Sequence, residues 1–353
     1  MSARTFYAAA HVVADPAAAD QTTVDWDATL RFRHHLWSLG LGVADAMDTA
    51  QRGMGLPWSG TDERGGPTGA RELIRRSGAE AKAVGGLLAC GAGTDHLSPG
   101  EHTLAGIEAA YAEQIEVVQA AGARVILMAS RALAANATGP DDYLNLYGRL
   151  LAQVDQPVIL HWLGDMFDPA LAGYWGDKDL DAATGTVLDL IRTHAYRIDG
   201  IKVSLLDAGR EIALRRALPA GVRLYTGDDY NYPELIAGDA EGFSHALLGI
   251  FDAVAVPAAA ALRALDAGDT AGFRAMLDPT VPLARHIFAA PTFHYKTGIV
   301  FLAWLNGHQE QFRMIAGQQT ARSREHLLEL YRLAGECGVL ADPEAAAAKV
   351  ATL

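Results

Sequence analysis

One lysine of this chain lies where an amine could act as a nucleophile. Lys202 occurs near the carboxyl end of an apolar run, Ile198–Ser204, which predicts a short buried strand. Lysine is rarely buried without a partner, and burial disfavours its charged form. A neutral amine can form a Schiff base with a carbonyl compound. The alternative is an ordinary strand-end lysine whose ammonium group reaches solvent, and this segment alone leaves both open.

Eight short apolar runs predict the strands that would position this lysine. Most of them are continuous rather than alternating, which is typical of strands buried on both faces of a parallel sheet. Helical patterns separate the runs. The expected strands cover residues 6–12, 40–46, 84–91, 125–129, 158–161, 200–204, 223–226 and 246–251.

The alternation of strands and helices predicts a (β/α)₈ TIM barrel. One helix start is marked by Pro140-Asp141-Asp142, after which Leu144, Tyr147 and Leu151 recur at helical spacing. We expect the barrel to span residues 1–255 and a C-terminal helical extension, residues 256–353, to pack on it. A doubly wound sheet is the competing architecture, but no glycine-rich dinucleotide fingerprint follows the first run.

Composition limits the partners. The formal net charge is −13, which argues against nucleic acid and against an anionic membrane surface. The longest apolar stretch is interrupted by Asp252, Pro257 and Arg263, so no membrane span is expected. Two cysteines, Cys90 and Cys337, suggest neither a disulfide framework nor a metal site. We therefore expect a cytoplasmic protein with a small-molecule partner.

Polar residues follow the predicted strands, and the loops after the strands form the functional end of such a barrel. Buried polar groups are costly unless they are paired or functional. The residues concerned are His11, residues 44–53, residues 91–96, Ser130 with Arg131, His161, Lys202 with Ser204, residues 226–229, and Asp252.

Four segments resemble the dihydrodipicolinate synthase and N-acetylneuraminate lyase superfamily. Gly200-Ile201-Lys202-Val203-Ser204 is similar to the Schiff-base lysine motif of that family. The segments 87–94, 157–162 and 224–229 resemble its third strand, its "Pro-x-x-Leu-Tyr-Asn" strand and its "Ser-Gly-Asp-Asp" segment. The resemblance covers residues 6–306. It implies that Lys202 is the covalent nucleophile and that the protein forms homodimers or homotetramers.

The chain departs from the family pattern around that lysine. His161 stands where the family has a catalytic tyrosine, and histidine can do acid–base work near neutral pH. Met166 replaces an arginine that grips a carboxylate, and residues 44–52 replace the loop that cradles the keto acid. We therefore expect a divergent, uncharacterised branch of the superfamily and do not expect dihydrodipicolinate synthesis itself.

The expected activity is that of a Schiff-base-forming (class I) aldolase or lyase, acting by retro-aldol cleavage or dehydration without a cofactor. The substrate would be a small hydroxylated keto acid or keto sugar. Lys202 and His161 are the predicted catalytic residues. The predicted substrate-binding residues are Asp45, Asp48, Arg52, Ser204 and Asp228.

Two other functions remain open at this point. His11, Asp45, Asp48, His161 and Asp228 could converge on a divalent ion in a metal-assisted isomerase or lyase, although no tight ligand spacing supports this. The second open function is that of a non-catalytic, sugar-binding barrel. The carboxylates of the loops could also cap helices and turns, a role that is common for aspartate.

Overall fold

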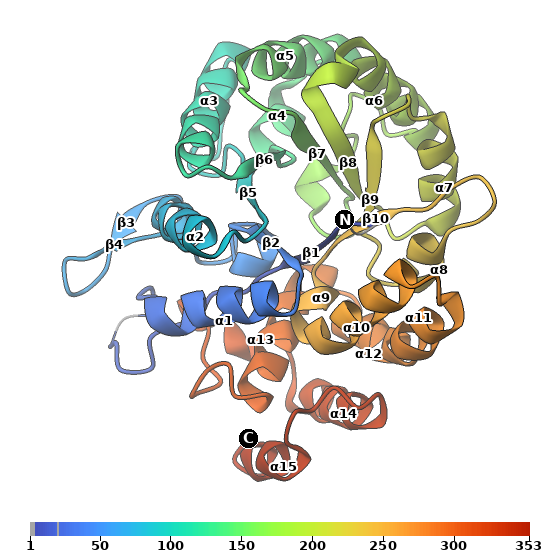
Figure 1. Ribbon diagram of the computed structural model, residues 1–353. Helices are drawn as coiled ribbons and strands as arrows, with labels where there is room; N and C mark the ends of the chain where they lie inside the picture. Colours follow the sequence, from blue (N-terminus) through green and yellow to red (C-terminus); the bar gives the residue numbers. More distant parts are fainter. Residues whose placement is uncertain (1–3, 20) are drawn as a thin grey trace.

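Eight parallel strands close into a barrel in the computed structural model, which describes residues 4–19 and 21–353 (Figure 1). The order around the barrel is β1-β10-β9-β8-β7-β6-β5-β2. Every predicted strand is present, and the predicted fold class is confirmed. The bounds are β1 Phe6–Ala9, β2 Gly42–Asp45, β5 Leu88–Ala92, β6 Arg124–Leu127, β7 Val158–Leu163, β8 Ile198–Ser204, β9 Arg223–Thr226 and β10 His245–Leu248.

Two details differ from the sequence prediction. A small antiparallel hairpin, β3 Gly60–Thr61 and β4 Pro67–Thr68, projects beside the barrel, and its short polar strands carry no apolar pattern. The last barrel strand ends at Leu248, and Phe251 belongs to the short helix α9, Ile250–Ala253.

Helices surround the barrel between successive strands (Figure 1). They are α1 Trp26–Ser38, α2 Ala70–Val84, α3 Leu104–Ala120, α4 Arg131–Asn136, α5 Pro140–Gln153, α6 Leu180–His194, α7 Ala208–Ala217 and α8 Tyr232–Ala237. Side chains of Asp25, Thr103, Ser130, Asp179 and Asp207 cap the starts of five of them by accepting backbone N–H groups. The proline-led start of α5 agrees with the sequence prediction.

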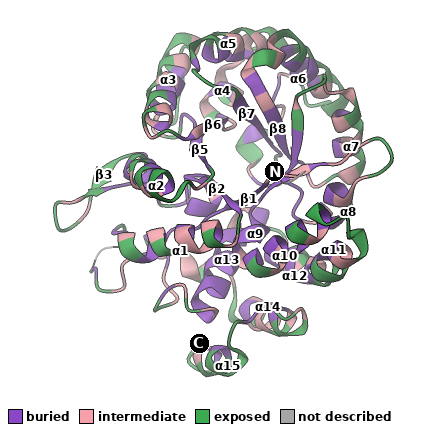
Figure 2. Cartoon of the chain, viewed as in Figure 1, coloured by how far each residue is buried: buried purple, intermediate pink, exposed green. Residues whose placement is uncertain are grey.

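The core has two parts. The larger part lies between the strands and the helices, while a smaller cluster fills the barrel interior. The interior cluster comprises Tyr7, Ala9, Ala44, Met47, Ala89, Ile126, Ile159, Tyr225 and Leu247. The strands are buried throughout most of their length and the helices expose their outer faces (Figure 2). At the amino ends of the strands, Asp199 binds Arg124, Arg223 and the Tyr225 hydroxyl.

Helices follow the last strand to the end of the chain. They are α10 Ala255–Asp266, α11 Thr270–Leu277, α12 Val281–Ile287, α13 Tyr295–Leu305, α14 Arg324–Glu336 and α15 Pro343–Val350. Short 3₁₀ segments are η1 Asp48–Ala50, η2 Pro169–Leu171, η3 Ala195–Arg197, η4 Asp278–Thr280, η5 Thr292–His294 and the kinked η6 Ile315–Thr320. The division of the chain at residue 255 stays a prediction.

Every residue of α13 is buried. The helix contacts α9 and η1, and it also contacts α14 and α15. Because η1 follows β2, the tail reaches the carboxyl end of the barrel. None of the helices in residues 4–19 and 21–353 is both long and apolar enough to cross a membrane.

Candidate active site

Lys202 and His161 lie side by side inside the barrel. In the β7–β8 ladder His161 pairs with Lys202, and Leu163 pairs with Ser204. Side chains two residues apart on a strand share a face, so Ile159 in the interior cluster places His161 inside, and Ser204 faces inward with Lys202. Lys202 is 8% exposed, and in the described part of the chain its ammonium group has no hydrogen-bond partner.

Burial sets the protonation of the lysine. It lowers the pKa of the Lys202 amine, while the negative charges of Asp229 and Asp48 oppose this effect. Asp229 accepts a hydrogen bond from the Ile250 amide at 2.8 Å. Burial raises the pKa of the Asp229 carboxyl to about 7, although Ile250 and Lys202 pull it downward. A buried amine therefore lies near a carboxyl group that titrates close to neutral pH.

His161 is a neutral imidazole at this position. Burial holds its pKa well below the usual range, and the charge of Lys202 lowers it further. Its Nε2 lies 3.4 Å from Ser204 Oγ, and its Nδ1 is buried without a partner among the described residues. The ring can therefore orient a bound group by hydrogen bonding, but it is a weak proton acceptor.

A cavity of about 570 Å³ opens at this end of the barrel. Residues from the loops after β2, β5, β6 and β7 form its wall. The wall includes Asp48, Arg52, Gly53, Asp95, Arg131, His161, Leu163 and Asp168. The Nε of Arg131 is held in an ion pair by Asp168. Cavities of this size accommodate small organic substrates.

Arg52 lies at the wall of the cavity, but its guanidinium group is occupied. It donates to Gln114 Oε1 at 2.7 Å and to the Gly91 carbonyl at 2.9 Å, and it forms an ion pair with Asp95. The side chain is buried and stabilises the loop after β2. Its predicted contact with substrate stays a prediction.

Asp45 lies away from the predicted substrate site. The carboxylate pairs with Arg33 of α1 at 2.8 Å and accepts from Ser77 Oγ of α2 at 2.6 Å. Both partners belong to the helix layer outside the barrel. Because Ala44 faces inward, Asp45 as the next residue of β2 faces outward. We therefore leave Asp45 out of the proposed substrate contacts.

Asp228 stabilises a turn. Its carboxylate accepts hydrogen bonds from the Tyr230 and Asn231 amides and from the Asn231 side chain, at 2.8 to 3.0 Å. These bonds occupy both oxygens, in line with the capping role that the sequence left open. The neighbouring Asp229 is the carboxyl whose charge acts on Lys202. The predicted contact of Asp228 with substrate stays a prediction.

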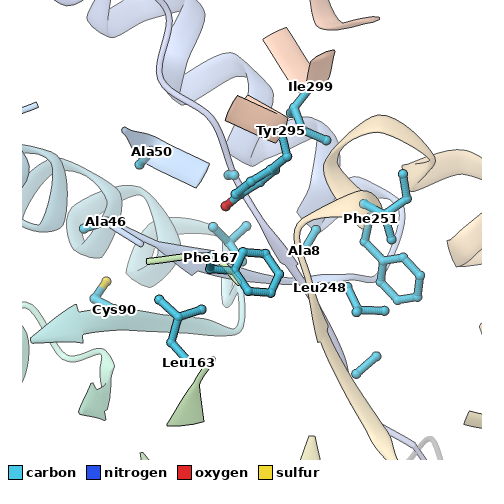
Figure 3. Packing of buried hydrophobic residues seen from close by; sticks show 14 of the residues in the cluster. Ala8, Ala46, Ala50, Cys90, Leu163, Phe167, Leu248, Phe251, Tyr295 and Ile299 are labelled. Atoms are coloured by element: carbon cyan, nitrogen blue, oxygen red, sulfur yellow. The ribbon is translucent and has the colours of Figure 1, made fainter. Parts of the chain in front are cut away.

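Two residues of α13 were missed by the sequence prediction. Tyr295 shares a 2.9 Å hydrogen bond with Thr49 Oγ1, and its ring stacks on Phe288 with centroids 4.4 Å apart. Figure 3 shows its hydroxyl oxygen pointing between Ala50 and Phe167. Lys296 follows it and is 1% exposed. The sequence signal that could have indicated these residues is a lysine at the start of an apolar helix.

The residues suggested for a metal site do not converge. His11 Nδ1 binds Asp252 Oδ2 at 2.8 Å, and Asp45 binds Arg33. Within residues 4–19 and 21–353, no group of three or more histidine, cysteine, aspartate or glutamate side chains is arranged to hold a metal ion.

The closed barrel with its C-terminal helices is the fold of solved dihydrodipicolinate synthase structures. The chain is similar to the enzyme from Aquifex aeolicus, with a TM-score of 0.69 and 14% identity over 96% of this chain and 99% of that chain. It is similar to YagE of E. coli K12 in complex with pyruvate, with a TM-score of 0.71, 14% identity and the same coverage. These likenesses establish the shared fold.

A third structure, the 4-hydroxy-tetrahydrodipicolinate synthase of Methylacidiphilum fumariolicum SolV, has a TM-score of 0.67 and 16% identity over 99% of this chain and 98% of that chain. No curated protein sequence matches the chain. The family model described as "Protein of unknown function (DUF993)" matches residues 1–353, and the chain belongs to that family.

Proposed function

We propose that the protein is a class I lyase, an aldolase or hydro-lyase that forms a Schiff base through Lys202. The observation that carries the proposal is the buried Lys202 amine, which has a lowered pKa and no hydrogen-bond partner in the described chain. An amine of this kind is available to attack a carbonyl carbon. The shared fold with dihydrodipicolinate synthases supports the same chemistry.

In the proposed reaction the Lys202 nitrogen adds to the substrate carbonyl, giving a carbinolamine. Loss of the former carbonyl oxygen as water then gives the iminium ion, which draws electrons from the neighbouring carbon. Ser204 and His161 lie on the same barrel face and would hydrogen-bond the carbinolamine oxygen. The carboxylates of Asp229 and Asp48 would stabilise the positive charge of the iminium.

The substrate in this proposal is a small hydroxylated keto acid or keto sugar. Arg131 supports an acid group, because Asp168 holds its Nε and it lines the cavity. Dihydrodipicolinate synthesis is not proposed, because the exposed Met166 stands in place of the expected arginine. By likeness to the family we also propose a homodimer or homotetramer and a cytoplasmic location.

Borohydride trapping tests the proposal. The protein is incubated with a panel of keto acids and keto sugars and then reduced with borohydride. After digestion, mass spectrometry measures the masses of its peptides. We expect a mass increase on the peptide that contains Lys202, its absence in Lys202→Met, and its retention in Lys82→Met, a change at an exposed lysine of α2. Turnover of any panel member without mass on Lys202 would refute the Schiff base. Binding without adduct or turnover would instead favour a sugar-binding barrel.

A further inference from the structure

A second buried lysine stands at the same end of the barrel, on the C-terminal extension. Lys296 Nζ donates to the Phe293 carbonyl at 3.1 Å and lies 3.9 Å from the centre of the Phe293 ring. Burial lowers the pKa of this amine to about 8, and the charge of Asp48 opposes the effect. Helix α13 contacts η1, which begins at Asp48. The extension therefore brings an amine up to the loop after β2.

Asp48 lines the cavity, and its negative charge acts on both amines, Lys202 and Lys296. In the part of the chain that the structure describes, the Asp48 carboxylate forms no hydrogen bond or ion pair. Other carboxylates around the mouth are engaged: Asp95 with Arg52, Asp168 with Arg131, and Asp229 with a backbone amide. Asp48 alone among these four keeps its oxygens available for a ligand.

His161 is less suited to proton transfer. Burial and the neighbouring Lys202 keep its ring neutral and weakly basic. Asp229 is already bound to the Ile250 amide and is fully enclosed. Asp48 instead has an unengaged carboxylate in the wall of the cavity that His161, the strand neighbour of Lys202, also lines. A carboxylate placed there can act as general base on a substrate bound in the cavity.

We propose that Asp48 is the catalytic carboxylate that moves protons in the Lys202 Schiff-base reaction, and that Lys296, on the helix packed against the Asp48 loop, is the residue that positions it. The proposal rests on the proposed function. It assigns to the C-terminal extension a part in the chemistry of the barrel.

Asp48 takes a proton from the carbon next to the iminium carbon, and the electron pair of that C–H bond moves into the iminium to give a neutral enamine. In retro-aldol cleavage Asp48 instead takes the proton of the hydroxyl on the β carbon, the C–C bond breaks, and an aldehyde leaves with the enamine remaining. The resulting carboxyl returns its proton to the enamine carbon, and water then releases the keto product from Lys202.

Deuterium exchange isolates this step from imine formation. A keto compound that traps on Lys202 is incubated in D₂O, and loss of its α-proton signal is followed by NMR. We expect Asp48→Asn to retain the borohydride adduct but to slow exchange by roughly 10²- to 10⁴-fold. Asp48→Glu should recover part of the rate. Asp155→Asn, a change of an exposed aspartate far from the mouth, should exchange at the normal rate.

The outcomes separate the two proposals. Absence of any wild-type adduct would refute the Schiff base, and with it the basis for this inference. An adduct in Asp48→Asn together with exchange within a few-fold of wild type would overturn the role of Asp48 while leaving Lys202 in place.

The role of Lys296 is tested with two variants that differ in the charge of the side chain. Lys296→Met removes the positive charge beside the Asp48 loop, while the borohydride adduct on Lys202 should remain. We expect α-proton exchange to slow by at least a few-fold, because the carboxylate loses the charge that orients it. Lys296→Arg keeps the charge and should restore the exchange rate. Exchange at the wild-type rate in a folded Lys296→Met protein, or an equal loss in both variants, would refute the positioning role. If Lys296→Met does not fold, slow exchange in a folded Lys296→Arg protein decides against it.

Discussion

The side chain of Lys202 occupies space that Gly227 leaves empty. A β-carbon at Gly227 would lie 2.8 Å from Lys202 Cε and would collide with Ser204 Oγ. Gly227 follows β9, the strand paired with β8, and its amide donates to the Val203 carbonyl at 2.8 Å. The glycine therefore admits the amine and the hydroxyl to the same small space.

Gly227→Ala should displace the lysine. We expect the rate of borohydride trapping on Lys202 to fall by at least an order of magnitude and the free energy of unfolding to fall by about 1–3 kcal/mol, because the added methyl group overpacks the barrel. Peptide mass spectrometry and urea denaturation measure the two effects. The control is Gly185→Ala within α6, where a β-carbon meets nothing within 4 Å. It should stabilise the helix by up to about 1 kcal/mol and leave trapping unchanged.

Asp229→Asn should shift the pH dependence of imine formation. Trapping requires the neutral amine, so its rate rises with pH, and burial places the rise below that of an ordinary lysine. The ionised Asp229 carboxylate favours the ammonium form of Lys202, and asparagine removes that charge. We therefore expect the rising limb to move to lower pH. A limb that moves to higher pH, or that does not move, would show that Asp229 does not control the lysine.

Arg33→Met should destabilise the protein strongly. It leaves the Asp45 carboxylate buried without its counter-ion, which typically costs about 3–5 kcal/mol. Adding Asp45→Asn to this variant should recover part of the loss in urea denaturation. Asp45→Asn alone should still trap carbonyl compounds on Lys202, because the carboxylate faces the helix layer. Loss of trapping in a folded Asp45→Asn protein would contradict this placement and favour the original substrate-binding prediction.

Glu211→Gln should flatten the dependence of stability on pH. Burial raises the pKa of the Glu211 carboxyl to about 8, above its unfolded value near 4.5, while hydrogen bonds from Ser244 and Thr226 partly oppose this effect. The folded state therefore holds a proton that the unfolded state has lost, and stability falls as pH rises from about 5 to about 8. Glutamine resembles the protonated form and keeps both hydroxyl partners, at 2.8 and 2.9 Å. Denaturation at pH 5 and pH 8 should show a smaller difference in the variant, and an unchanged difference would rule out Glu211 as its source.

The barrel itself was predictable because burial on both faces of each strand leaves continuous apolar runs. The position of Lys202 and His161 followed from the same runs, since both residues interrupt apolar strands near their carboxyl ends. The family resemblance of four segments in order agreed with this arrangement. Strand ends were predicted less well, as at Phe251, because an apolar run continues smoothly from a strand into a short buried helix.

The details of the site were less predictable for a physical reason. A strand buried on both faces carries no polar–apolar alternation, so the sequence does not reveal that Ala44 faces the barrel and Asp45 the helices. In the turn after β9, backbone geometry decides that Asp228 is used by local amides while Asp229 acts on Lys202. Lys296 reaches the mouth through tertiary packing of α13, which no local pattern encodes.

The burial of α13 also bears on how the protein is made. During synthesis the eight strands leave the ribosome before the helix that carries Tyr295 and Lys296. A nascent barrel therefore holds Lys202 before Asp48 gains its second amine and before Thr49 gains its tyrosine partner. If Asp48 works as proposed, the nascent barrel carries its nucleophile before Lys296 lies beside the Asp48 loop, and proton transfer reaches its full rate only once the C-terminal helices have docked.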